Sequence, residues 1–323
     1  MQDNILKGTT SQVSSNIQLV EEGTDEIFIA CASFEDRTTA VASKLSLSYQ
    51  ITTSLVLKYD ERNRTALREQ NFERLVNTLV PHSKNVLPII CDHHDPIDGI
   101  SKIRDLSKAK GIALQGRNIT IDITTFTKQY LLVLLKFIEK QAPKSIRLFY
   151  TEPEDYAIKW DKPLSYGLID IVSIPSYGGH FSVEKESLLI LMLGYEGDRA
   201  YGIWERFTPH KTIVAVGRPS FRKYWEGRVE EFNRKLLSKL PEDAVCYFHT
   251  LDPFEVSKNL DNLIEHHSDR FNISVSPLGP KPQVIGCYLS VRRYPDVQIV
   301  YAIPKFHEEE YFSKKIGRIW EYR

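Results

Sequence analysis

The sequence has no excess of charge of either sign and few cysteines. Its 42 Lys and Arg residues balance 42 Asp and Glu residues, so the formal net charge is zero. A neutral chain has no long-range field to attract duplex nucleic acid or an anionic membrane, so any anion site must be local. The four cysteines show no CxxC or similar paired spacing, which favours small core residues of a reducing compartment over disulfides or zinc ligands.

Signals for membrane insertion and for the common cofactors are also missing. The first residues, MQDNILKGTTSQVSSN, lack the apolar core of a signal peptide, and the longest apolar stretches are too short to span a bilayer. We therefore expect a soluble, cytoplasmic protein without membrane contact. No GxGxxG follows the first strand and no Walker sequence occurs, so we expect no cofactor. Cys91-Asp92-His93-His94-Asp95 has metal-ligand residue types, but consecutive side chains cannot all turn towards one ion, so we expect no metal.

An internal repeat is the most informative feature that is present. The apolar run EIFIACAS from Glu26 corresponds to LLILMLG from Leu188, and the turns SFEDR and GYEGDR follow them. Four further pairs follow in the same order: SLVLKY with TIVAVG, VLPIICDHHDPID with AVCYFHTLDPFE, ITIDITTFTK with ISVSPLGPK, and SIRLFYTEP with QIVYAIPK. The offset drifts only from about 162 to about 151 residues, which is hard to obtain without a duplication.

Each copy alternates short apolar strands with helical patterns, as right-handed βαβ units do. The sequence therefore predicts an α/β fold of two tandem Rossmann-like units, with mainly parallel sheets covered by helices on both faces. We place an N-terminal arm at 1–25, the first repeat at 26–151, a connector at 152–186, the second repeat at 187–304 and a tail at 305–323. A long amphipathic helix is expected after each second strand. Asp95 and Asp252, each followed by proline, are predicted helix N-caps, and a helix is predicted over Gln129–Lys140.

The first candidate site is the turn after the first strand of each copy. It contains Ser33, Phe34, Glu35 and Arg37 in the first copy, and Tyr195, Glu196 and Arg199 in the second. An arginine at a helix start opposes the macrodipole unless an anion sits beside it, and helix amides with a guanidinium form a phosphate site. The alternative is that each glutamate pairs with the nearby arginine to order the loop.

The second candidate site is the loop after the fourth strand, with Thr124, Thr125, Thr127 and Lys128 in the first copy and Lys281 in the second. Both lysines open a helix, again where an anion is expected, and the threonines add hydroxyl donors. The alternative is that the threonines are N-caps beside a solvated lysine. Loops at the carboxyl ends of parallel strands face one crevice. Four arginines after the second strands extend a phosphate-binding rim or begin solvated helices: Arg62, Arg64, Arg218 and Arg222.

The segment DITTFTK after an apolar strand resembles the D-x-T-G-G-T-K motif of CRISPR-associated Rossmann-fold (CARF) sensor domains. The serine-containing turn after the first strand is similar to the other ligand loop of that family. The matching positions are Ser33, Thr124, Thr127 and Lys128, with Lys281 as the counterpart in the second copy. Thr125-Phe126 stand where the motif has two glycines, and the second copy has SPLGPK.

The resemblance implies a nucleotide-signal sensor of bacterial or archaeal antiviral defence. Such a sensor binds a cyclic oligonucleotide, or a similar phosphorylated nucleotide, in a cleft between two Rossmann-like halves, and passes its signal to an effector protein partner or acts as a homodimer. Some members also cleave the ligand as metal-independent ring nucleases, by attack of a ribose 2′-hydroxyl on the adjacent phosphate. For this chain that reaction would use Lys128 to stabilise charge, with Arg37 and Arg199, and Glu35 or Glu196 as base.

Two alternatives stay open. One is a protein-interaction or immunity subunit of a defence complex without catalysis. The other is a metabolic enzyme that acts on a phosphorylated small molecule.

Overall fold

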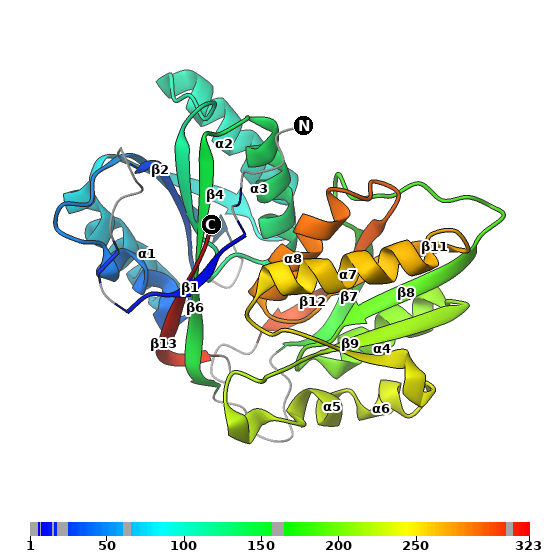
Figure 1. Cartoon of the computed structure of the whole chain (residues 1–323). Helices are drawn as coiled ribbons and strands as arrows, with labels where there is room; N and C mark the ends of the chain where they lie inside the picture. The colour runs from blue at the N-terminus through cyan, green and yellow to red at the C-terminus, as the bar shows by residue number, and fades with distance from the viewer. Residues whose placement is uncertain are drawn as a thin grey trace. The chain divides into compact units, whose positions relative to one another are not determined.

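The computed structural model describes residues 6, 8–14, 16–17, 25–60, 66–156, 165–307 and 313–323. The chain divides into two compact units, unit 1 (Met1–Ala157 with Phe312–Arg323) and unit 2 (Ile158–Tyr311). Each unit is a mostly parallel sheet with helices on both faces (Figure 1), so the predicted fold class of two Rossmann-like α/β units is confirmed. Within the described ranges, no helix is both long and apolar enough to cross a membrane.

Unit 1 is built on a seven-stranded sheet. Its strands are β1 (Thr10–Gln12), β2 (Asp25–Ala32), β3 (Ile51–Asp60), β4 (Ser83–Asp92), β5 (Asn118–Asp122), β6 (Ser145–Tyr156) and β13 (Ser313–Tyr322). In the sheet order β1-β13-β6-β5-β2-β3-β4, the strands from β6 to β4 are parallel, whereas β13 and β1 pair antiparallel. The strand order reverses between β2 and β5, which makes the carboxyl edge there the topological switch point.

Helices cover the two faces of this sheet. Helix α1 (Ala66–Leu79) lies on one face. Three short 3-10 turns contact it: η1 (Asp36–Thr39), η2 (Ala42–Lys44) and η3 (Val80–His82). Helices α2 (Pro96–Lys110) and α3 (Lys128–Lys140) lie together on the other face (Figure 1). The helix predicted over Gln129–Lys140 is therefore confirmed as α3.

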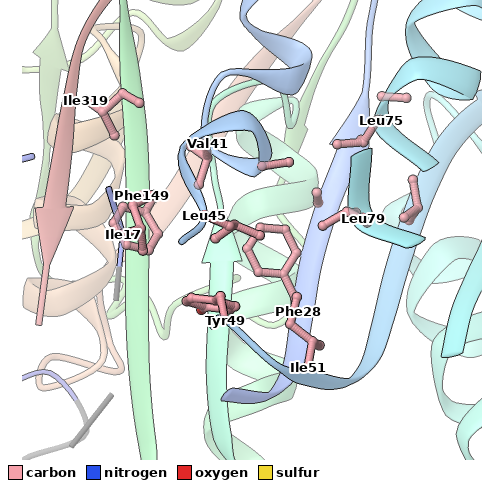
Figure 2. Close-up of a cluster of buried hydrophobic side chains, with 14 residues drawn as sticks. Ile17, Phe28, Val41, Leu45, Tyr49, Ile51, Leu75, Leu79, Phe149 and Ile319 are labelled. Atoms are coloured by element: carbon pink, nitrogen blue, oxygen red, sulfur yellow. The ribbon is translucent and has the colours of Figure 1, made fainter. Parts of the chain in front are cut away.

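A cluster of buried apolar side chains fills the space between the sheet and α1 (Figure 2). Phe28 comes from the central strand β2, and Leu75 and Leu79 come from one face of α1, four residues apart. Val41 and Tyr49 close the cluster from the segment that follows η1. Because β2 is apolar on both of its faces, it suits the centre of a parallel sheet covered on both sides.

Unit 2 has a six-stranded sheet in the order β10-β9-β8-β11-β12-β7. Its strands are β7 (Ser165–Ser173), β8 (Glu186–Met192), β9 (Lys211–Gly217), β10 (Val245–Phe248), β11 (Phe271–Pro277) and β12 (Gln298–His307). Its helical segments are α4 (Gly197–Phe207), η4 (Lys223–Trp225), α5 (Arg228–Phe232), α6 (Arg234–Leu237), η5 (Glu242–Ala244), α7 (Pro253–His267) and α8 (Lys281–Val291). Strand β7 is antiparallel to β12, and the other pairs are parallel.

The two units share one strand order, since β4-β3-β2-β5-β6 in unit 1 corresponds to β10-β9-β8-β11-β12 in unit 2. The predicted helix caps are confirmed. The Asp95 carboxylate accepts from the backbone N–H groups of Ile97 (2.9 Å) and Asp98 (3.2 Å), and Asp252 accepts from those of Phe254 (2.9 Å) and Glu255 (3.3 Å). Each cap precedes a proline in the first helical turn, where a missing N–H costs nothing.

The long helix expected after the second strand forms in unit 1 as α1 but not in unit 2. There the chain forms the two short helices α5 and α6, which meet at Asn233. The Asn233 side chain donates hydrogen bonds to the carbonyls of Val229 (2.7 Å) and Gly194 (2.8 Å). Because these bonds compete with the backbone bonds of a continuous helix, they favour a break between α5 and α6. The backbone also passes close to Gly197, whose Cβ, if present, would lie 1.9 Å from the Phe232 carbonyl oxygen.

The predicted connector and tail are not simple linkers. Strand β6 continues to Tyr156 and β12 to His307, and each segment that follows contains a further strand, β7 or β13. Strand β7 pairs with β12 of the second repeat, whereas β13 pairs with β6 of the first. Strand β7, which follows β6 in the chain, thus extends the sheet of the second repeat, and β13, which follows β12, extends the sheet of the first. Local sequence patterns cannot show this exchange. The arm at 1–25 contains β1, which pairs with β13.

Candidate functional site

Glu35 and Arg37, predicted as site residues after β2, form a buried ion pair in unit 1. Their side chains are only 5% and 3% exposed. The guanidinium donates to one Glu35 oxygen through Nε (3.1 Å) and Nη2, and to the Thr151 carbonyl of β6 through Nη1 (2.6 Å). Ser313 of β13 donates to the same carboxylate oxygen. Burial by itself lowers the pKa of Arg37, but the Glu35 carboxylate, with smaller effects of Tyr150 and Tyr156, raises it, and the pKa lies above its ordinary value.

Unit 2 repeats this arrangement with Glu196 and Arg199. The Arg199 guanidinium pairs with the Glu196 carboxylate, donates to the Ala302 carbonyl of β12, and lies 4.8 Å from the centre of the Tyr301 ring. In both units the pair therefore ties the turn after the first strand to the fifth strand. The structure thus shows the pairing of each glutamate with the nearby arginine that was the alternative to a phosphate site. The roles of these residues in ligand binding or catalysis stay predictions.

Two asparagines that were not predicted hold the same turns. The Asn71 side chain of α1 donates to the carbonyls of Ser33 (3.0 Å) and Glu35 (3.3 Å), and Asn233 donates to Gly194 in unit 2. Asn71 is the first residue of the segment NFERL and Asn233 is the third residue of its paired segment EFNRKL. The presence of an asparagine in each paired segment is the signal that could have identified them, although the two positions do not align. Phe34, also a predicted ligand residue, is partly buried, and the Arg68 guanidinium lies 4.9 Å from its ring centre.

The predicted threonines of the β5–α3 loop are engaged within unit 1. Thr124 is fully buried, and its hydroxyl accepts from the Thr151 N–H at 3.0 Å. The Thr125 hydroxyl donates to the Cys31 carbonyl at the end of β2. Thr127 caps α3 by accepting from the Tyr130 N–H (3.4 Å), so the predicted alternative role as an N-cap is confirmed for this residue. Lys128 is the first residue of α3 and is partly exposed.

These contacts show which predicted residues come together. The Thr125 to Cys31 bond joins the loop after β5 to the end of β2, so the turn that contains Ser33 and Phe34 and the start of α3 share the same edge of the sheet at the switch point. The turn η1, which contains Arg37, packs beside α1, whereas α3, which begins at Lys128, packs beside α2 on the other face of the sheet (Figure 1). The accessible part of the edge therefore comprises Ser33, Phe34, Thr127 and Lys128.

An aromatic cluster that was not predicted borders the same edge. The rings of Tyr59 and His93 lie 4.9 Å apart, and Tyr59 is equally close to Tyr130. The Tyr59 hydroxyl accepts from the Thr127 N–H (3.1 Å), and the Tyr130 hydroxyl donates to the Asp95 carbonyl (2.7 Å). Burial, with smaller effects of His94 and Arg68, lowers the pKa of His93 to about 3, so its ring is neutral near pH 7. No metal-binding group of three or more His, Cys, Asp or Glu residues occurs in the part of the chain that the structure describes.

The corresponding edge of unit 2 is built from glycines and prolines. A Cβ on Gly194 would lie 2.4 Å from the Leu278 carbonyl oxygen, so the turn after β8 and the loop after β11 touch only because this residue is glycine. Lys281 opens α8 between two prolines, which leaves fewer backbone N–H groups for an anion than α3 offers. The predicted ligand residue Tyr195 packs edge-on against Trp225 at 5.3 Å and Phe232 at 5.9 Å. The predicted rim residues Arg62 and Arg64 lie outside the described residues.

No family model matches this sequence. No curated protein matches it either. One solved structure that resembles it is an N-terminal ketoreductase from a macrolactin assembly line. The similarity has 10% sequence identity and a TM-score of 0.25, and it covers 90% of this chain and 72% of the ketoreductase. A similarity this weak supports no conclusion about relatives or activity.

Proposed function

We propose that this protein is a nucleotide-signal sensor that binds a cyclic oligonucleotide, or a related phosphorylated nucleotide, at the carboxyl edge of unit 1. The observation that supports this is the junction made by Thr125 and Cys31. It sets the serine-containing turn after β2 beside the Thr-Lys start of α3, across the switch point of a parallel sheet. Ligands of open α/β sheets bind at that point, and a helix start with a lysine suits a phosphate.

The arrangement favours binding over cleavage. Glu35 and Glu196, the predicted bases, are each held by an arginine in a buried or nearly buried pair. A carboxylate that is bonded to a guanidinium and shielded from solvent is not placed to take a proton from a ribose hydroxyl. The proposed role is therefore recognition of the nucleotide and transmission of its presence, with antiviral defence as the setting that the resemblance implies.

A second candidate is a protein-interaction subunit. It is favoured by apolar side chains at the amino edge of the unit 2 sheet. Phe181 is half exposed and Val183 is fully exposed. They lie on or beside a pocket of about 330 Å³ whose walls include His180, Phe271 and Asp296. Exposed apolar groups rimmed by polar ones are typical of contact surfaces for other proteins.

Thermal denaturation with a panel of cyclic and linear oligonucleotides tests the proposal. A ligand at 100 times its Kd stabilises the folded state by about 2.7 kcal/mol, which gives a clear rise in Tm. We expect a cyclic oligoadenylate or related ligand to raise Tm for the wild type and not for Lys128→Ala. Lys140→Ala, which changes the other end of α3, is the matched control and should respond like the wild type.

Three outcomes contradict the proposal. If no nucleotide raises Tm and a stable protein partner co-purifies, the interaction subunit is supported instead. If a small phosphorylated metabolite raises Tm and is turned over, the protein is a metabolic enzyme. If a nucleotide binds equally well to Lys128→Ala and the wild type, the site is not at the start of α3.

A further inference from the structure

The segment that follows β9 in unit 2 concentrates positive charge in a chain whose net charge is zero. Between residues 218 and 235 it has six basic side chains and only three acidic ones. It begins at the carboxyl end of β9, beside the edge strand β10. The proposed nucleotide site in unit 1 uses none of these residues, so their charge requires a separate explanation.

A buried tryptophan holds this segment in place. Trp225 is 2% exposed and packs edge-on against Tyr195, which follows β8. The neighbouring Tyr224 contacts Trp225 at 6.1 Å between ring centres, yet it is 68% exposed. Tyr224 therefore presents an aromatic face to solvent from a backbone that Trp225 anchors, which lowers the entropy lost when another ring stacks on it.

A second exposed ring lies at the end of β10. Tyr247 is 50% exposed, and the Arg218 guanidinium lies 3.9 Å from its ring centre. Glu230 holds Arg218 in this position through a 3.0 Å ion pair, and the Arg218 N–H donates to the Phe248 carbonyl at 2.8 Å. The guanidinium plane and the ring are thus preorganised, and the segment that begins at Arg218 also carries the partly exposed Arg222 and the exposed Lys223.

Exposed aromatic rings alternating with cations match the chemistry of single-stranded nucleic acids. Unpaired bases stack on tyrosine, whatever their sequence, while nearby arginine and lysine side chains neutralise the phosphates. A duplex hides its base faces and gains nothing from the rings. We propose that Arg218, Arg222, Lys223, Tyr224 and Tyr247 form a stacking platform for a single-stranded oligonucleotide, here called the unit 2 platform. It does not depend on the nucleotide site proposed for unit 1.

Fluorescence anisotropy with the full chain and a labelled single-stranded RNA of about ten nucleotides and mixed sequence tests this proposal. Loss of one stacking ring should raise Kd by roughly 5- to 150-fold, so Tyr224→Ala and Tyr247→Ala should each bind clearly more weakly. Tyr224→Phe and Tyr247→Phe, which keep the ring, should bind like the wild type. If about three cations contact phosphates, Kd should rise roughly 20-fold between about 50 and 200 mM salt.

The amino edge of unit 2 provides matched controls. Arg270 there lies 5.1 Å from the Phe271 ring, the same kind of pair as Arg218 with Tyr247, and Phe181 is about as exposed as Tyr247. Arg270→Ala and Phe181→Ala should bind the RNA like the wild type. So should Lys128→Ala, which separates this proposal from the function proposed above.

The proposal is overturned by any of three results. The wild type does not bind the RNA at low salt, the two Tyr→Ala variants bind it as tightly as the wild type, or a duplex of the same sequence binds as well as the single strand. Because both tyrosines are exposed, we expect the variants to fold. An unchanged circular dichroism spectrum then shows that a loss of binding is not caused by a loss of fold.

Discussion

Replacing Arg37 with methionine separates a structural role of the Glu35–Arg37 pair from a ligand role. The methionine keeps much of the aliphatic packing but removes the guanidinium, which is 3% exposed and bonds both Glu35 and the Thr151 carbonyl. Removing one partner of a buried ion pair leaves an uncompensated charge, at a cost of about 3–5 kcal/mol. We therefore expect the free energy of unfolding to fall by about that amount.

Urea denaturation at pH 7, followed by circular dichroism, measures this loss. The double variant Glu35→Gln with Arg37→Met should lose less than the sum of the two single variants, because neither charge is then left alone in the interior. Arg74→Met, on the exposed side of α1, is the control and should change stability by less than about 0.5 kcal/mol.

The reasoning is refuted if Arg37→Met unfolds at the same urea concentration as the wild type. If the same variant also abolished the nucleotide-induced rise in Tm, Arg37 would be a ligand residue after all. The predicted phosphate role would then replace the structural one.

Three further predictions concern pH, capping and close packing. Because the pKa of His93 is lowered to about 3, the folded ring stays neutral while the unfolded one takes a proton below about pH 6.5. The free energy of unfolding should therefore fall as the pH drops from about 6.5 towards 3, by at most about 1.4 kcal/mol per pH unit. Urea denaturation at pH 7 and at pH 5 should show a smaller fall for His93→Gln than for the wild type. Asp95→Ala and Asp252→Ala should each lower the free energy of unfolding by about 1 kcal/mol in the same assay, and an unchanged value would show that the caps are unimportant. Gly197→Ala should cost about 1–3 kcal/mol, seen as a lower Tm, because its Cβ would lie 1.9 Å from the Phe232 carbonyl oxygen.

Features that depend on neighbouring residues could be predicted from the sequence. The aspartate caps followed by proline, the apolar face of α3 and the repeated order of the parallel strands are all set by local patterns. Those patterns gave the fold class and the two predicted loops. The alignment of the repeats also placed Arg37 against Arg199.

Features that depend on distant partners could not be predicted. Nothing near Arg37 shows that its guanidinium reaches the carbonyl of Thr151, 114 residues away, or that Arg199 reaches Ala302, 103 residues away. A turn whose arginine binds a phosphate and a turn whose arginine is buried in an ion pair can have the same local sequence. Strands β7 and β13 were missed for the same reason, because each pairs with a strand more than 100 residues away.

The pairing of β13 with β6 reverses the order in which the two units can be finished during synthesis. The first-made unit leaves β6 without its antiparallel neighbour until residues 313–322 have emerged from the ribosome. The later-made unit already has β7 when its own β12 appears, so its sheet can close sooner. Translation adds about 5–20 residues per second, so the open edge of β6 persists for roughly ten seconds or more. During that interval the nascent chain exposes a strand edge that another polypeptide can join, which makes this edge a place where a chaperone would protect the unfinished fold.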